Sequence, residues 1–266
     1  MIRVGSHVPA SHPLAGLAAR GADVAQLHLS APRQWRAPLP REDATKLATA
    51  GVVATVHAPY LCNPVSGDAR VRDRTAKALQ QTLDGAATVG AGAVVVHAGH
   101  ATDRVGLDVA VDRWLDLAAG LSSTVPLLIE NTATGAAAAG RTLEQWTALF
   151  AALRAADLDV PVAGCLDTCH AFAGDPAAAP DPGGWVHAAA DAAGIVPVLH
   201  VNDSLAGPGE RRDRHANVGA GLAGVDWLAA FVTAAAERGA TTFLVETPGG
   251  ADAQAADIAW VRSVLA

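Results

Sequence analysis

Short apolar runs alternate along the chain with longer stretches of helical period, and this alternation is the feature that most limits the fold. The runs consist of continuous Val, Ile, Leu and Ala, which is typical of parallel strands covered on both faces. They predict strands at residues 2–8, 24–29, 52–58, 93–99, 126–131, 162–167, 196–203 and 241–248. The stretches between them predict helices near residues 13–20, 41–50, 69–90, 104–120, 142–155, 184–193, 222–238 and 252–264. Eight β-α units in 266 residues predict an α/β fold, a (β/α)8 TIM barrel with residues 1–266 as one domain.

His, Asp and Glu residues end six of the predicted strands or follow them closely. Active sites of (β/α)8 barrels lie at the carboxyl ends of the strands, so these side chains are expected to meet. Imidazole and carboxylate are ligand types for Zn²⁺ and similar transition ions. The predicted metal ligands are His57, His97, Glu130, Asp167, His170, His200, Asp213, His215 and Glu246. Nine such groups exceed the needs of one tetrahedral ion, which predicts a multinuclear metal site.

The ends of three consecutive strands carry the first of these residues. A single strand-end His is more often packed and hydrogen-bonded than bound to a metal. His57 and His97, however, end adjacent strands, and Glu130 ends the next one. Because adjacent strands lie about 4.8 Å apart, the three side chains can converge on one ion.

Short spacings in the second half of the chain favour further metal ligands. The spacing Asp167-x-x-His170 places two side chains on one face of a first helical turn. In a polar loop, Asp213-x-His215 lets both side chains point the same way in an extended segment. An isolated Asp at a strand end is most often a helix N-cap, and that is the interpretation of Asp203.

The composition is that of a protein with a large core, because 51% of the residues are hydrophobic and 17% are charged. No apolar run approaches the roughly 18–20 residues that span a bilayer. The first residues lack the apolar region of a signal peptide. Cys62, Cys165 and Cys169 are odd in number and lack C-x-x-C spacing, which argues against a disulfide framework or a zinc ribbon. We therefore expect a cytoplasmic protein with no membrane partner.

The formal charge of −7 does not exclude a nucleic-acid partner. Four of the negative charges belong to the predicted metal ligands. Three Zn²⁺ ions would bring the total to about −1 and make the site locally positive. The charge therefore indicates only that non-specific electrostatic binding to DNA is modest.

The chain resembles the endonuclease IV family of apurinic/apyrimidinic (AP) endonucleases. The matching segments occur in the family's order and span residues 5–248; they are GSHV, PRQW, HAPYL, VVHAGH, IENTATG, GCLDTCHAFAGD, LHVNDS, DRHANVGAG and ETP. The resemblance implies a trinuclear zinc TIM barrel that acts in base-excision repair, with three Zn²⁺ ions per chain and Mn²⁺ as a substitute. Every position of the family's nine-ligand pattern is present.

The resemblance also implies how the ligands divide among the three ions. The first ion would be held by His57, His97 and Glu130. Glu130 would bridge to a second ion, whose other ligands are Asp167, His200 and Glu246. The third ion would be held by His170, Asp213 and His215. Glu130, Glu246 and Asp213 are the predicted catalytic residues.

Four further residues are implied to contact DNA. Tyr60 and Leu61 match the family residues that wedge into the duplex at the abasic site, and Arg33 matches a residue that enters the duplex. Arg214 is predicted to contact phosphate. A wedge is physically reasonable because flipping a nucleotide out of the duplex leaves a gap and costs stacking energy.

The reaction implied is hydrolysis of the phosphodiester 5′ to an abasic site in duplex DNA, which leaves a 3′-hydroxyl and a 5′-deoxyribose phosphate. The same chemistry would trim blocked 3′ ends, and the protein is expected to be a monomer. The alternative is a metal-dependent sugar isomerase or epimerase, which shares this barrel but needs only one or two ions and a closed polar pocket. A DNA-binding module with structural zinc is disfavoured because such sites are usually closed and rich in Cys.

Overall fold

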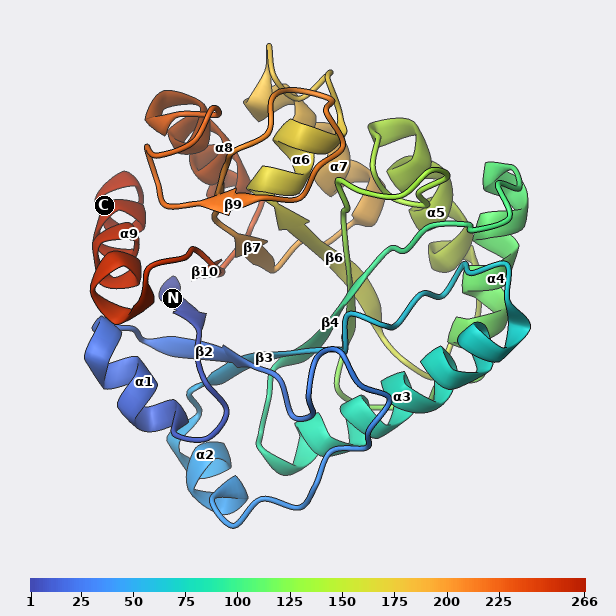
Figure 1. The fold of residues 1–266 in the computed structure, drawn as a ribbon, viewed down its shortest axis with the longest axis horizontal. Helices are drawn as coiled ribbons and strands as arrows, with labels where there is room; N and C mark the ends of the chain where they lie inside the picture. The colour runs from blue at the N-terminus through green and yellow to red at the C-terminus, as the bar shows by residue number, and fades with distance from the viewer.

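Eight parallel strands close into a barrel in the computed structural model, which describes residues 1–266 (Figure 1). The order around the barrel is β1-β10-β7-β6-β5-β4-β3-β2. The strands are β1 (Arg3–His7), β2 (Val24–Leu27), β3 (Val53–His57), β4 (Ala93–His97), β5 (Leu127–Glu130), β6 (Val162–Asp167), β7 (Val198–His200) and β10 (Thr242–Val245). The predicted TIM barrel is therefore confirmed.

Eight helices form an outer ring around the strands (Figure 1). They are α1 (Pro13–Arg20), α2 (Ala44–Ala50), α3 (Ala69–Thr88), α4 (Leu107–Ala119), α5 (Leu143–Ala155), α7 (Pro182–Ala193), α8 (Val225–Glu237) and α9 (Gly250–Val264). All eight were predicted, with ends that differ by a few residues. An additional short helix, α6 (Thr168–Gly174), follows β6 directly.

The predicted strand at residues 196–203 is wrong in length, because β7 covers only Val198–His200. Beyond it the chain leaves the barrel and forms β8 (Asp203–Ser204), which pairs in antiparallel fashion with β9 (His215–Ala216). His215, which was predicted to lie in a loop, is thus placed in a strand. The apolar run could not reveal this break, because backbone and side-chain hydrogen bonds of the hairpin end the barrel strand.

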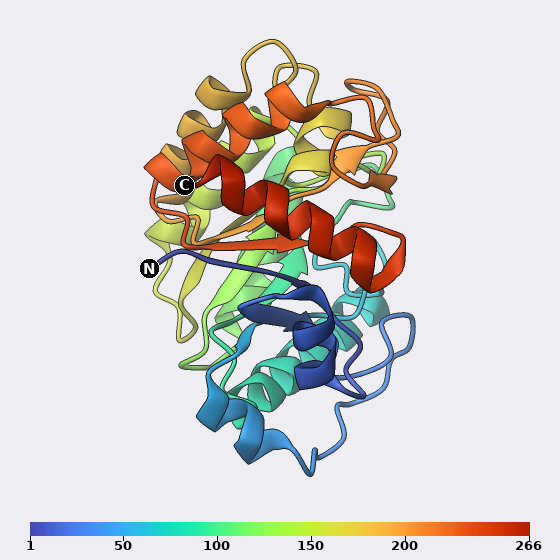
Figure 2. The same cartoon turned by 90° about the vertical axis from the view of Figure 1, so that its left-hand side faces the viewer.

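The barrel closes where the two ends of the sequence meet. Strand β1 pairs with both β10 and β2, and helix α9 lies beside α1 (Figure 1). A side chain at Gly5 would collide with the backbone carbonyl of Val24, so this seam needs a glycine. Both termini lie at the end of the barrel where the strands begin (Figure 2). The loops after the strands are therefore free to form a site at the other end.

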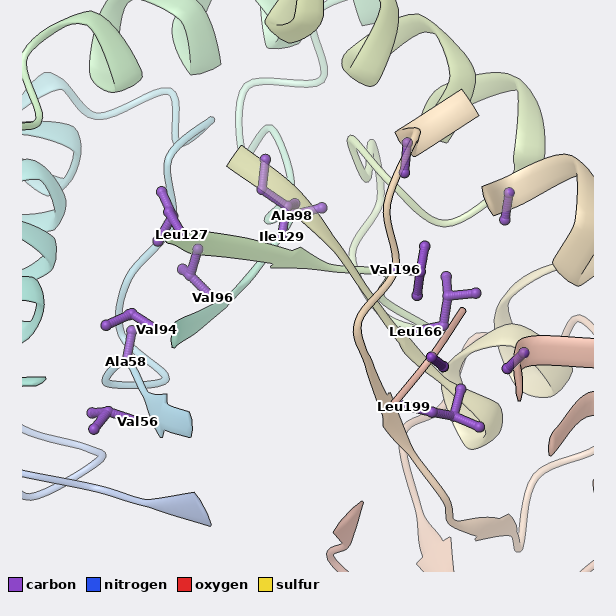
Figure 3. Close-up of a cluster of buried hydrophobic side chains, with 14 of the residues drawn as sticks. Val56, Ala58, Val94, Val96, Ala98, Leu127, Ile129, Leu166, Val196 and Leu199 are labelled. Carbon is purple, nitrogen blue, oxygen red and sulfur yellow. The ribbon is translucent and has the colours of Figure 1, made fainter. Parts of the chain in front are cut away.

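The two faces of each strand pack against different surroundings. One face packs against the helices and belongs to a core of 53 buried residues; among them, Val94, Val96, Leu127, Ile129 and Leu199 are labelled in Figure 3. The other face points into the barrel. There it forms a small apolar layer of eight buried residues, namely Val24, Ala54, Ala93, Val95, Leu128, Cys165, Val198 and Leu244.

None of the helices is both long enough and apolar enough to cross a membrane.

Candidate metal centre

The period of two along a strand carries the metal-type side chains into the barrel interior. Val95 and Leu128 belong to the interior apolar layer, and two residues further on their strands end in His97 and Glu130. The same step of two leads from Cys165 to Asp167, from Val198 to His200 and from Leu244 to Glu246. A polar layer therefore lies directly above the apolar layer, at the carboxyl ends of the strands.

Nitrogen and oxygen atoms of this layer fall into three groups, in each of which one ligand atom per residue lies within 4.8 Å of the others. The groups are His57, His97 and Glu130; then Glu130, Asp167, His200 and Glu246; then His170, Asp213 and His215. Glu130 belongs to two groups and its side chain is completely buried. All nine residues predicted to bind metal are brought together, in the three sets that the resemblance implied.

The third group depends on the elements that hydropathy did not predict. His170 is buried in α6, and its Nε2 lies 3.4 Å from Asp213 Oδ2. His215 lies in β9, with Nε2 at 3.2 Å from Asp213 Oδ1. Helix α6 and the β8-β9 hairpin thus complete the cluster on one side of the barrel mouth.

The donor set and its spacing fit divalent zinc. Ligands about 2.1 Å from a tetrahedral Zn²⁺ ion lie about 3.4 Å from one another. His57 Nε2 and His97 Nε2 lie 3.2 and 3.5 Å from Glu130 Oε2. His200 Nδ1 lies 3.0 Å from Glu130 Oε1 and 3.5 Å from Glu246 Oε2. The groups are therefore already close to the separations that ion binding requires.

Backbone carbonyls orient two of the imidazoles. Nδ1 of His57 lies 2.7 Å from the carbonyl oxygen of Ala58, and Nδ1 of His170 lies 2.9 Å from that of Asn131. A ring nitrogen that donates to a carbonyl carries the proton, which leaves the other nitrogen with a free lone pair. In both residues that other nitrogen, Nε2, points to the carboxylates of the cluster.

Gln26 orients His200 and Glu246, and the sequence analysis did not identify it. Its side-chain oxygen lies 3.0 Å from His200 Nε2 and also accepts a hydrogen bond from Thr55 Oγ1. Its amide nitrogen donates to Glu246 Oε1. A buried Gln within the apolar run VAQLHL is the signal that could have indicated it, because such a group needs partners.

Asp167 has two roles at once. Its Oδ1 accepts from the backbone N–H of His170 and caps α6, while its Oδ2 accepts a hydrogen bond of 2.7 Å from Asn202. Asn131 also bonds the backbone of Asp167 on both sides, as donor and as acceptor. An N-cap and a ligand are therefore not alternatives at this position, because a carboxylate has two oxygens.

The interpretation of Asp203 as a helix N-cap is wrong, since the N-cap of α8 is Gly224. Asp203 is buried, and its two oxygens accept from five backbone N–H groups. These belong to Ser204 and to the loop that precedes α8, at Gly219, Gly221, Ala223 and Gly224. Asp203 thus holds this loop beside the β8-β9 hairpin.

The charges of the cluster shift the protonation of its members. Burial alone would raise the pKa of Glu130, but His200 and His97 outweigh it and hold that pKa well below its usual range. Burial lowers the pKa of His170, yet Asp167 and Asp213 outweigh this effect and raise it well above the ordinary value. The carboxylates therefore favour a second proton on His170, at Nε2, which a bound cation would displace to free the lone pair of that nitrogen.

Cys169 lies within reach of Asp167 and His215 and forms a fourth group with them. Burial raises the pKa of its thiol to about 11. Only a thiolate is a good nucleophile or ligand, so a thiol with this pKa is poorly suited to either role.

Two of the residues predicted to contact DNA, Tyr60 and Arg214, lie beside residues of the cluster. The Tyr60 side chain is 47% exposed, and its ring lies against those of His57, His97 and His28. Leu61, next to it, is half-buried. Arg214 is exposed beside Asp213, to whose carbonyl oxygen it donates a hydrogen bond. Arg33 is exposed and makes no side-chain hydrogen bond or ion pair.

Comparison with known proteins agrees with this geometry. The profile of the xylose isomerase-like TIM barrel family matches residues 14–264. A D-tagatose 3-epimerase-like protein has the same fold, with a TM-score of 0.73 and 17% sequence identity over 99% of this chain and 97% of the other. The chain is thus a xylose isomerase-like TIM barrel, a class that includes barrels of different activities.

Two nearer relatives narrow the class. The chain is 42% identical over 232 residues to the probable endonuclease 4 of Mycobacterium ulcerans strain Agy99, covering 87% of this chain and 89% of the relative. The crystal structure of endonuclease IV from Thermus thermophilus superposes with a TM-score of 0.82 at 30% identity, covering 99% and 98% of the two chains. The chain belongs to the endonuclease IV family of AP endonucleases, and it is therefore an enzyme.

Proposed function

We propose that this protein cuts the phosphodiester 5′ to an abasic site in duplex DNA, with three zinc ions bound by the nine clustered residues. The 3′-hydroxyl and 5′-deoxyribose phosphate ends, the trimming of blocked 3′ ends and a monomeric enzyme belong to the same proposal. Its substrate would be chromosomal DNA, which is consistent with the cytoplasmic location expected from the sequence.

The observation that carries the proposal is the convergence of nine donor side chains in three groups that share Glu130. Four of these side chains are carboxylates, namely Glu130, Asp167, Asp213 and Glu246. Three divalent ions would turn the local charge from about −4 to about +2, which suits an anionic phosphodiester. An apolar or neutral substrate would need no such concentration of positive charge.

Different residues in and around the cluster have different roles in the proposed hydrolysis. Bound divalent ions supply positive charge next to phosphorus and lower the pKa of water. Glu130 is buried at the centre of the cluster, where its charged carboxylate can orient a water molecule by accepting a hydrogen bond from it. Gln26 holds one oxygen of Glu246, so the other remains directed at His200 and the second group. Asp213 is 40% exposed and faces the incoming substrate.

The residues at the edge of the cluster favour a large substrate over a small sugar. The ring of Tyr60 packs against the rings of His28, His57 and His97 at the edge of the cluster, and its exposed part can stack on a base. We assign Leu61 to the wedge beside it, Arg33 to the interior of the duplex and Arg214 to a phosphate.

The isomerase alternative needs a Glu pair or a lysine for proton transfer, and the two clustered glutamates, Glu130 and Glu246, both belong to the proposed metal groups. The chain has only two lysines, Lys46 and Lys77, and both lie exposed on outer helices rather than in the barrel mouth. His97 and Asp213 keep 25% and 40% of their side chains exposed, so the cluster is open to a macromolecule.

The decisive experiment is incubation of the purified protein with a duplex that carries one abasic site on a labelled strand. We expect incision on the 5′ side of the site and none in the matched undamaged duplex. An aldose or ketose series tested in parallel should show no isomerisation. Sugar conversion without incision would replace this proposal with the isomerase.

Metal content tests the second part of the proposal. Elemental analysis should find about three ions per chain, mostly zinc, and removal of the ions by a chelator should abolish incision until Zn²⁺ or Mn²⁺ is restored. Full activity with a single ion per chain would contradict the trinuclear site.

A further inference from the structure

A basic groove lies on the outside of the barrel, between the loop after β2 and helix α3. It has a volume of about 430 Å³ and is lined by Trp35, Arg36, Ala37, Arg74, Lys77, Ala78 and Gln81. The residues of α3 recur at spacings of three and four, so they share one face of the helix. Arg70 extends the same face by one turn and is also exposed. None of the predicted metal ligands or DNA contacts lines this groove.

The cations of this groove have no acidic partners. Arg36, Arg70, Arg74 and Lys77 form no ion pair and no side-chain hydrogen bond. By contrast, the ion pairs of arginine elsewhere join Arg41 to Asp43, Arg113 to Asp103, Arg238 to Asp191 and Arg262 to Asp23. Asp73 and Asp84 lie exposed on α3, but neither pairs with a cation of the groove. In a chain of net charge −7, this face therefore carries four positive charges that no acidic side chain pairs with.

The groove shares Arg36 and Ala37 with a neighbouring cavity, which reaches His28 beside Tyr60. The outer wall of the groove belongs to the loop after β2, in which the carbonyl oxygen of Pro32 accepts a hydrogen bond of 2.8 Å from the backbone N–H of Tyr60. The loop then passes beside α3, where Pro38 and Leu29 lie against Gly85 (Figure 1). Helix α3 follows β3, so Arg70 lies at the helix end nearer the metal centre and Lys77 lies further away. The cations of α3 thus form a row, called a track below, that leads along the helix away from the barrel mouth.

We propose that this groove binds the phosphodiester backbone of the duplex arm that flanks the lesion. This inference rests on the proposed function. A track of unpaired cations matches the regular negative charge of a DNA backbone, and contacts to phosphates position a duplex without reading its sequence. The groove acts on binding only, since it lies outside the metal centre.

The test compares two variants with the same change of charge. Arg74→Gln with Lys77→Gln removes two cations of the groove, and glutamine preserves the helix. Arg3→Gln with Arg154→Gln removes two cations at the opposite end of the barrel, at the start of β1 and the end of α5. Both are assayed as intact metal-loaded enzyme, on a long duplex with a central abasic site and on two duplexes truncated on one or the other side of that site.

The groove variant should have an unchanged kcat and a KM raised about tenfold on the long duplex, with a salt dependence reduced by about two counterions. The difference from the parent should vanish on one of the truncated duplexes, the one that lacks the arm lying in the groove. The control variant should match the parent on all three. A groove variant with the parent's KM and salt dependence on the long duplex would overturn the inference.

Binding of an undamaged duplex, followed by fluorescence anisotropy, separates this inference from the proposed function. The groove variant should bind it more weakly than the control does, whether or not the parent cuts abasic DNA. Absence of incision by the parent would contradict the proposed function alone, and equal affinity of the two variants would contradict the groove alone.

Discussion

Two layers inside the barrel differ in chemistry although they come from the same strands. The lower layer is apolar and includes Val95 and Leu128. The upper layer begins two residues later, with His97 and Glu130, and gathers charged and polar groups. The lower layer can only stabilise the barrel, whereas the upper layer concentrates negative charge that a metal must compensate. The residues that stabilise the barrel and the residues that form the site are therefore only two positions apart on the same strand.

Glu130→Gln should produce the largest effect, and that effect should fall on the cleavage step rather than on DNA binding. The substitution keeps the shape of the side chain but removes the charge that two groups of the cluster share. We expect the single-turnover cleavage rate to fall by roughly 10³-fold or more, because a neutral amide is a poor bridging ligand and cannot orient the attacking water as a carboxylate does. Binding of abasic DNA, measured by gel shift, should be largely kept. Cleavage within tenfold of the parent would remove Glu130 from the mechanism.

Leu128→Ala should affect the lower layer and spare the upper one. Leu128 is fully buried two residues before Glu130, so its truncation leaves a cavity. The free energy of unfolding should fall by about 3 kcal/mol, measured by denaturant titration of the metal-loaded protein. Metal content and cleavage at low temperature should remain close to those of the parent. Loss of bound metal in this variant would show that the two layers are not separable.

Gln26→Met tests a residue that supports the upper layer without being a ligand. The variant keeps the size of the side chain but removes the partners of His200 and Glu246. Metal affinity should weaken by about 10–100-fold, the usual effect of losing a group that orients ligands. Thr55→Val is the matched control, since Thr55 bonds Gln26 but no ligand. Equal metal affinity in Gln26→Met and the parent would show that His200 and Glu246 are oriented by other contacts.

Tyr60→Ala tests the rim above the two layers and should have the smallest effect on the folded protein. Metal content and the unfolding free energy should not change, because Tyr60 is half-exposed and is not a ligand. Affinity for abasic duplex should fall by about 1–3 kcal/mol, the worth of an aromatic stack on a base. Unchanged affinity for the lesion would exclude Tyr60 as a wedge.

The sequence allowed most of the fold to be predicted because buried parallel strands need continuous apolar runs. It also indicated all nine clustered residues, since polar groups that end such runs must meet at one end of a barrel. The prediction was wrong at Asp203, whose partners lie at Gly219 to Gly224. The residue is an ordinary Asp in the sequence, and only the folded loop shows which backbone groups it binds.

The sequence by itself determined the barrel, its eight β-α units and the presence of a cluster of metal-type side chains. These properties follow from the repeat of apolar residues, every second residue in a strand and every 3.6 residues in a helix, and from the hydrophobic effect. The repeats are local in the sequence, and the hydrophobic effect acts on every chain. Only the tertiary structure decided that the β8-β9 hairpin brings His215 beside α6, that Gln26 joins His200 to Glu246, and that unpaired cations of α3 and the β2 loop share a groove. Each of these depends on contacts between segments far apart in the chain, where distance and orientation, rather than residue type, decide which groups meet.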